Sequence, residues 1–140
     1  MSWQSYGLDR IAQKLVLNHR DKGVLNESHK MRTTVAYGLE RFWGEHLRFL
    51  GKGGDKDKGE YWQATWREFV KIMKKAGVSV PKGQVNPEKT EQIRKTAEEF
   101  WNSENFSLDD QRVSLAVLTQ LCDSLVWWTQ RYKKKEQKSN

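Results

Sequence analysis

Apolar residues recur at steps of three and four along most of this chain, which is the period of one face of an α-helix. The pattern predicts helices over residues 5–18, 28–50, 60–76, 87–101 and 107–132. In the second of these, Leu39, Phe42, His46 and Phe49 lie on one stripe. No segment shows the sustained alternation typical of a strand. The prediction is an all-α fold, a helical bundle of about five helices.

Two segments interrupt the helical pattern. The sequence GKGGDKDKG at 51–59 has four glycines and five charged residues, so we expect a flexible Gly/Lys loop there. Near 77–87, Pro81 and Pro87 restrict the residues before them, which predicts an extended connector. Ser28, Asn86 and Ser107 are the residue types that cap helix N-termini, and each precedes a predicted helix.

A length of 140 residues fits a single helical domain, 1–140, and leaves open two lobes, 1–76 and 87–135, with a frayed basic tail at 136–140. Large aromatic residues supply much of the predicted core. On the helical stripes, and therefore expected inside, are Trp43, Trp62, Trp66, Trp101 and Trp128. Trp127 points about 100° away from Trp128 around its helix, and Trp3 is near the end of the chain, so these two are candidates for contact with a partner.

Bulk features restrict the setting of the protein. The chain has one cysteine, Cys122, which excludes an intrachain disulfide and favours a cytoplasmic protein. The N-terminus lacks the pattern of a signal peptide. The longest apolar-rich stretch, 113–128, is interrupted by polar residues, so it reads as a buried helix and predicts no membrane association.

Charge is the main indicator of function. The chain has 25 Lys and Arg against 18 Asp and Glu, a net charge of +7, which favours a polyanionic partner. Residues 71–82 hold four lysines and no acid, residues 88–110 sum to −4, and residues 112–140 sum to +4. We therefore predict that phosphate binds on one side and a protein neighbour on the other. The predicted nucleic-acid contacts are Arg32, Arg48, Lys52, Lys71, Lys74, Lys75, Lys82, Arg112, Arg131 and Lys134.

Signatures of catalysis are weak. The three histidines lack metal-ligand spacing, and neither a phosphate loop nor a nucleophile elbow is present. We therefore predict a protein that is not an enzyme and has no metal, cofactor or small-molecule substrate. One alternative remains, because Arg41 and His46 are separated by four residues, a spacing that resembles the HEPN ribonucleases. That resemblance implies metal-independent RNA cleavage, with His46 as acid/base and Arg41 stabilising the phosphorane. The match departs from the family at Phe42, where a polar residue is usual.

Taken whole, the chain resembles the small helical subunits of CRISPR effector complexes, including those of type I-D systems. The shared features are a basic all-helical chain, a mid-chain loop and an aromatic-rich final helix with a basic end, here LAVLTQLCDSLVWWTQRYKKK. The resemblance implies a non-enzymatic role in antiviral defence. Several copies would contact one another and other subunits, and basic faces would hold RNA or DNA, as the guide–target duplex or the displaced strand. A third reading is a helical adaptor whose charge serves solubility.

Overall fold

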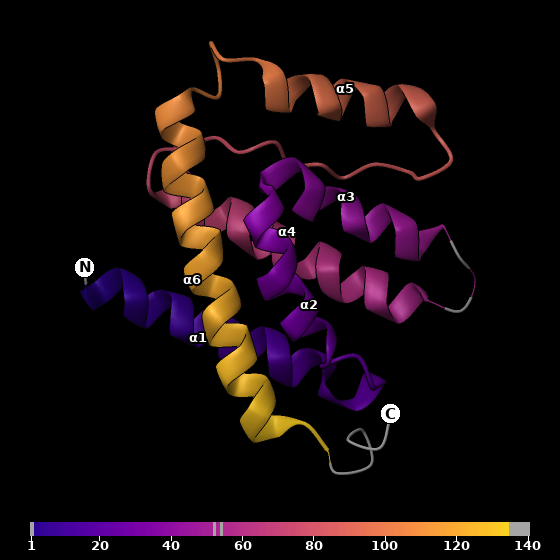
Figure 1. Ribbon diagram of the computed structural model, residues 1–140, viewed down its shortest axis with the longest axis vertical. Coiled ribbons are helices and arrows are strands. Elements are labelled where there is room, and N and C mark those ends of the chain that lie inside the picture. Colours follow the sequence, from indigo (N-terminus) through magenta and orange to yellow (C-terminus); the bar gives the residue numbers. More distant parts are fainter. Residues whose placement is uncertain (1, 52, 54, 135–140) are drawn as a thin grey trace.

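The computed structural model describes residues 2–51, 53 and 55–134, with side chains described from residue 7 onward. Throughout these residues the regular structure is helical, which confirms the predicted all-α bundle (Figure 1). The α-helices are α1 (Ser2–His19), α2 (Glu27–Thr34), α3 (Leu39–Leu50), α4 (Lys56–Lys75), α5 (Thr90–Trp101) and α6 (Leu108–Tyr132). Two short 3₁₀ turns, η1 (Arg20–Lys22) and η2 (Val35–Tyr37), complete the elements.

The longest helix, α6, runs along the molecule and packs against α1 and α2, while α3 and α4 lie side by side (Figure 1). Helix α5 lies at one end of the long axis, and the C-terminal end of α6 lies at the other. An extended connector separates α5 from α3. The arrangement places the acidic segment and the basic end of the last helix far apart. None of the helices in the described ranges has the length and apolar content needed to cross a bilayer.

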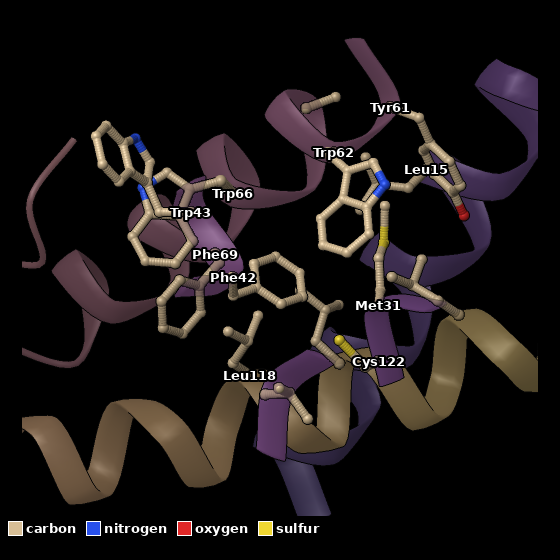
Figure 2. Packing of buried hydrophobic residues seen from close by; sticks show 14 of the residues in the cluster. Leu15, Met31, Phe42, Trp43, Tyr61, Trp62, Trp66, Phe69, Leu118 and Cys122 are labelled. Carbon is tan, nitrogen blue, oxygen red and sulfur yellow. The ribbon is translucent and has the colours of Figure 1, made fainter. Parts of the chain in front are cut away.

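Aromatic side chains fill the space between the α3–α4 pair and α6 (Figure 2). The ring of Phe42 lies 5.0 Å from that of Trp62, and Trp66 lies 5.1 Å from Phe69, centroid to centroid. Trp43, Trp62 and Trp66 are buried, as their stripe positions predict. Large rings at these spacings stabilise the packing beyond the area that they remove from water.

The predicted core position of Trp101 is wrong, because its side chain is 78% exposed at the end of α5. Helix α5 presents its neighbouring residue, Phe100, to the core instead, where the Phe100 ring meets Trp43 and Trp66 at 5.6 and 5.9 Å. Two adjacent aromatic residues point about 100° apart on a helix, so one helix face buries only one of them.

The single helix predicted over 28–50 is also wrong. Gly38 has a φ of +103°, a conformation that ends η2 and separates α2 from α3. Ser28, the predicted N-cap, is buried instead, and its hydroxyl bonds those of Tyr61 at 2.6 Å and Thr129 at 2.7 Å. This group joins α2, α4 and α6, so a polar residue here serves the interior rather than a helix terminus.

The predicted loop at 51–59 is shorter, because α4 already begins at Lys56. Asp57 stands in its first turn, where an acid suits the positive end of the helix dipole. The predicted connector is extended, but α5 begins at Thr90, and Asn86 accepts a hydrogen bond from the Glu88 N–H in a turn before it. Ser107 caps α6 as predicted, since its hydroxyl accepts from the Asp110 N–H at 3.1 Å.

Two buried tryptophans hold the connector in place. The Trp66 indole N–H donates to the Pro81 carbonyl at 3.0 Å, and that of Trp43 donates to the Gly83 carbonyl at 2.9 Å. Gly83 has a φ of +68°, and a Cβ at this position would lie 2.1 Å from Trp43 Nε1. The connector therefore follows the surface of α3 and α4 only because residue 83 is glycine.

Candidate nucleic-acid interface

The predicted phosphate contacts do not form one continuous face. They belong to α2, α3, α4, the connector and both ends of α6. Arg112 and Arg131, for example, are nineteen positions apart in one helix, or about 28 Å along its axis. Lys52 lies outside the described residues, as does the predicted tail at 136–140.

Of the nine predicted cations that the structure describes, five have an acidic neighbour within 4 Å. The pairs are Arg32–Asp123 at 2.5 Å, Arg48–Glu45 at 2.8 Å, Lys71–Glu68 at 3.3 Å, Arg112–Asp109 at 3.7 Å and Lys134–Asp21 at 2.7 Å. Such exposed pairs contribute little to stability, but each one reduces the local positive potential. The better candidates for phosphate binding are therefore the surface regions where cations outnumber acids.

One such place is the last turn of α4. Lys74 and Lys75 are exposed, and neither has a carboxylate within 4 Å among the described residues. With Lys71 they share one helix face, because residues three and four apart are neighbours on the surface. We call Lys71, Lys74 and Lys75 the α4-end lysines.

A second basic cluster lies where α6 ends against η1. The Arg20 Nε donates to the Tyr132 carbonyl at 2.6 Å, which caps one of the carbonyls left unpaired at a helix C-terminus. The contact between Lys134 and Asp21 closes the same junction. We call the cations of this junction the basic corner: Arg20, Lys22, Arg131, Lys133 and Lys134. Among the described residues, the acids paired with these cations are Asp21 and Asp57, the latter 3.8 Å from Lys22.

Only part of the basic corner is predictable from the sequence. Arg131 and Lys134 are among the predicted contacts, and Lys133 belongs to the same basic run. The sequence pattern does not point to Arg20 and Lys22, because they lie more than a hundred residues away along the chain. Only the packing of α1 and η1 against α6 reveals that they are neighbours.

An exposed aromatic residue stands beside the basic corner. Trp127 is 47% exposed, as expected for a candidate partner contact, and the guanidinium carbon of Arg131 lies 3.7 Å above its ring. Trp128 meets Trp127 edge-on at 4.7 Å and stacks on Tyr132 at 5.1 Å. Trp128 is half-buried rather than inside the core. The other predicted partner contact, Trp3, has its side chain outside the described residues.

Lys82 lies in a different environment. It is exposed on the connector and lines an open groove of about 670 Å³ between the connector and α5. Lys95 and Glu99 line the same groove, so its charge is mixed. Among the described residues, no cluster of three or more potential metal ligands is present.

The geometry of Arg41 and His46 does not support a ribonuclease site. His46 is 2% exposed, and its Nδ1 donates to the Trp43 carbonyl at 2.5 Å. Nε2 is buried without a partner in the described residues. Burial lowers the pKa of His46, which keeps the imidazole neutral. Arg41 is exposed and lies 6.0 Å from the Tyr37 ring. An RNA phosphate on the surface near Arg41 would therefore not reach His46.

Comparison with known proteins adds no family to this geometry: no protein-family model, no curated protein and no solved structure matches the chain.

Proposed function

We propose that the protein binds nucleic acid through the sugar–phosphate backbone, with the basic corner as the main contact and the α4-end lysines as a second one. One observation carries the proposal. The basic corner lies at the opposite end of the long axis from α5, and the segment 88–110, which contains α5, has a net charge of −4 (Figure 1). The basic corner is therefore separated from the acidic segment along the long axis, which orients a polyanion toward that end.

The binding mode follows from the chemistry of the cluster. Lysine and arginine side chains neutralise phosphates and release condensed counterions, so the affinity falls steeply with salt concentration. Such contacts position the protein on the backbone without reading base edges. In this proposal the protein holds nucleic acid and does not cleave it.

We further propose that this binding serves a multi-subunit RNA-guided effector complex, as the resemblance to CRISPR small subunits implies. The acidic segment 88–110, with the exposed Trp101, is the surface that we assign to a protein neighbour, including other copies of the chain. Exposed tryptophans are frequent energetic centres of protein interfaces. Mass spectrometry of what co-purifies with the tagged protein tests this setting. Recovery of guide RNA with other subunits would support it, and recovery of neither would contradict it.

Charge reversal tests the backbone interface. Two double variants alter the proposed contacts: Lys22→Glu with Lys133→Glu in the basic corner, and Lys74→Glu with Lys75→Glu at the end of α4. The control is Lys89→Glu with Lys95→Glu, at exposed positions in the acidic segment. Each double variant changes the net charge from +7 by −4 to +3, so only the position of the charge differs.

We expect the basic-corner variant to lose the most affinity for a single- or double-stranded oligonucleotide at about 50 mM salt, with the α4-end variant next and the control closest to wild type. Fluorescence anisotropy gives the dissociation constants. Equal losses in all three variants would mean that only the net charge matters, which would contradict a defined interface.

A further inference from the structure

Trp127 and Arg131 form a layered pair on the surface of α6. Binding of the sugar–phosphate backbone of nucleic acid does not explain why the Trp127 ring is exposed there. The guanidinium carbon lies 3.7 Å above the indole ring, well inside the range of a cation–π contact. Arg131 also donates to the Trp127 carbonyl and to Gln130 Oε1, both at 3.3 Å, so its head group is held beside the ring. Even so, both side chains remain exposed.

The rings beneath this pair are fixed by the fold. Trp128, the edge-on neighbour of Trp127, donates from its indole nitrogen to Asp9 Oδ1 at 3.0 Å. Tyr132, stacked on Trp128, accepts a hydrogen bond at its hydroxyl from Gln13 Nε2 at 2.8 Å. Two residues of α1 thus hold the aromatic cluster in place. The exposed pair is therefore supported before any ligand arrives, which lowers the entropy cost of binding a flat group.

We propose that the Trp127–Arg131 pair is a stacking site for a nucleobase of a single-stranded nucleic acid. This inference rests on the proposed backbone binding, because the phosphates on either side of the base would contact the adjacent basic corner. Aromatic rings and guanidinium planes are the two groups on which unpaired bases stack in protein complexes. A duplex hides its base faces, so the pair adds selectivity for single strands that charge alone does not provide.

A protein partner is the competing occupant, since tryptophan and arginine are also common at the centre of protein interfaces. The charge around the pair favours nucleic acid. Arg131 lies over the ring, and Lys133 and Lys134 follow it directly in the chain, whereas the other exposed tryptophan, Trp101, lies in the acidic segment 88–110. The two tryptophans therefore form a matched pair for experiment, with similar chemistry in opposite electrostatic settings.

The test compares two oligonucleotides of the same length: one with thymine bases and one with abasic sites throughout, so that both have the same phosphates. Anisotropy gives the affinity of wild type, Trp127→Ala, Trp127→Phe and Trp101→Ala for each. We expect wild type to bind the base-containing strand roughly 5- to 100-fold more tightly than the abasic strand. Trp127→Ala should lose this preference while keeping its affinity for the abasic strand, Trp127→Phe should keep part of it, and Trp101→Ala should keep all of it.

The outcomes separate this inference from the proposed function. If wild type binds both strands with equal affinity, the stacking site is wrong and backbone binding stands. If wild type binds neither strand, the proposed function fails as well. A preference that survives in Trp127→Ala would also overturn the stacking site. A third result would overturn it as well: wild type binds both strands equally, and Trp127→Ala loses a subunit that co-purifies with wild type. That result would assign the pair to a protein interface.

Discussion

His46 shows how one residue of the helical stripe shapes the behaviour of the core. Its imidazole is buried, with Nδ1 bonded to the Trp43 carbonyl and Nε2 without a partner among the described residues. Burial disfavours the charged form and lowers the pKa of His46 below its ordinary value of 6.5. The unfolded chain therefore takes up a proton at a higher pH than the folded protein does.

Acidification should consequently destabilise the fold through His46. As the pH falls below about 6.5, the unfolded state binds a proton that the folded state does not, so the free energy of unfolding decreases until the pH passes the lower folded pKa. In His46→Gln this contribution is absent, so the loss of stability between pH 7 and pH 5 should be smaller than in wild type. Urea unfolding at both pH values measures the difference, with His29→Gln as the control. The same pH dependence in wild type and His46→Gln would contradict this account.

Gly83 is a second residue whose identity is set by its surroundings. An alanine there would be strained by the positive φ and would also clash with the Trp43 indole. Gly23 has a nearly equal φ of +71° with nothing within 4 Å of the Cβ position, so Gly23→Ala is strained without a clash. We expect Gly83→Ala to lower the free energy of unfolding by about 1–3 kcal/mol more than Gly23→Ala does. Equal losses in urea unfolding would show that the contact between the connector and Trp43 is not tight.

At the scale of elements, the α3–α4 pair depends on one close approach. A Cβ at Gly59 would lie 2.7 Å from Leu50 Cδ2 and 3.1 Å from the Leu50 nitrogen, whereas Gly44 in α3 has open space around it. Both glycines are within helices, where alanine is favoured by about 1 kcal/mol. The structure thus separates a glycine required by packing from one that is not.

We expect Gly44→Ala to raise the free energy of unfolding by up to about 1 kcal/mol, and Gly59→Ala to lower it or leave it unchanged. Thermal and urea unfolding of the two variants provide the comparison. A gain of similar size in both would mean that α3 and α4 do not approach closely at this point.

The limits of sequence prediction are clearest at the ends of the elements. Periodicity predicts the helical segments because burial of an apolar stripe determines them, and the stripe Leu39, Phe42, His46 and Phe49 is indeed buried. Periodicity does not reveal the break at Gly38, because the apolar spacing continues through it. Nor does it distinguish Phe100 from Trp101, since the choice depends on how α5 lies over the connector.

The sequence pattern also does not predict which polar groups are buried. Glu27 is 2% exposed, and its carboxylate accepts a hydrogen bond from the Trp62 indole at 2.9 Å while Lys30 lies 3.3 Å away. In the sequence it appears as an ordinary surface acid. A buried carboxylate is tolerated only when such partners are present, and they come from the tertiary arrangement of α2 and α4.

At the scale of the whole molecule, the sequence predicts only some of the residues of the candidate interface. The sequence identifies Arg131, Lys134 and the α4-end lysines from charge alone. It does not show that Arg20 joins the same corner, or that five of the nine described cations have acidic neighbours. The basic corner is separated from α5 and the acidic segment that contains it because α6 spans the length of the molecule (Figure 1).

The salt dependence of nucleic-acid binding tests the central claim most directly. The wild-type affinity for a single-stranded oligonucleotide should be measured by anisotropy from about 50 to 200 mM salt. With about four to six phosphates neutralised at the basic corner and the α4-end lysines, the slope of log K against log salt should be about −3 to −4. In the basic-corner variant the slope should be shallower by about 0.7 for each phosphate that is no longer neutralised. No detectable binding at about 50 mM salt, or a slope near zero, would contradict the account.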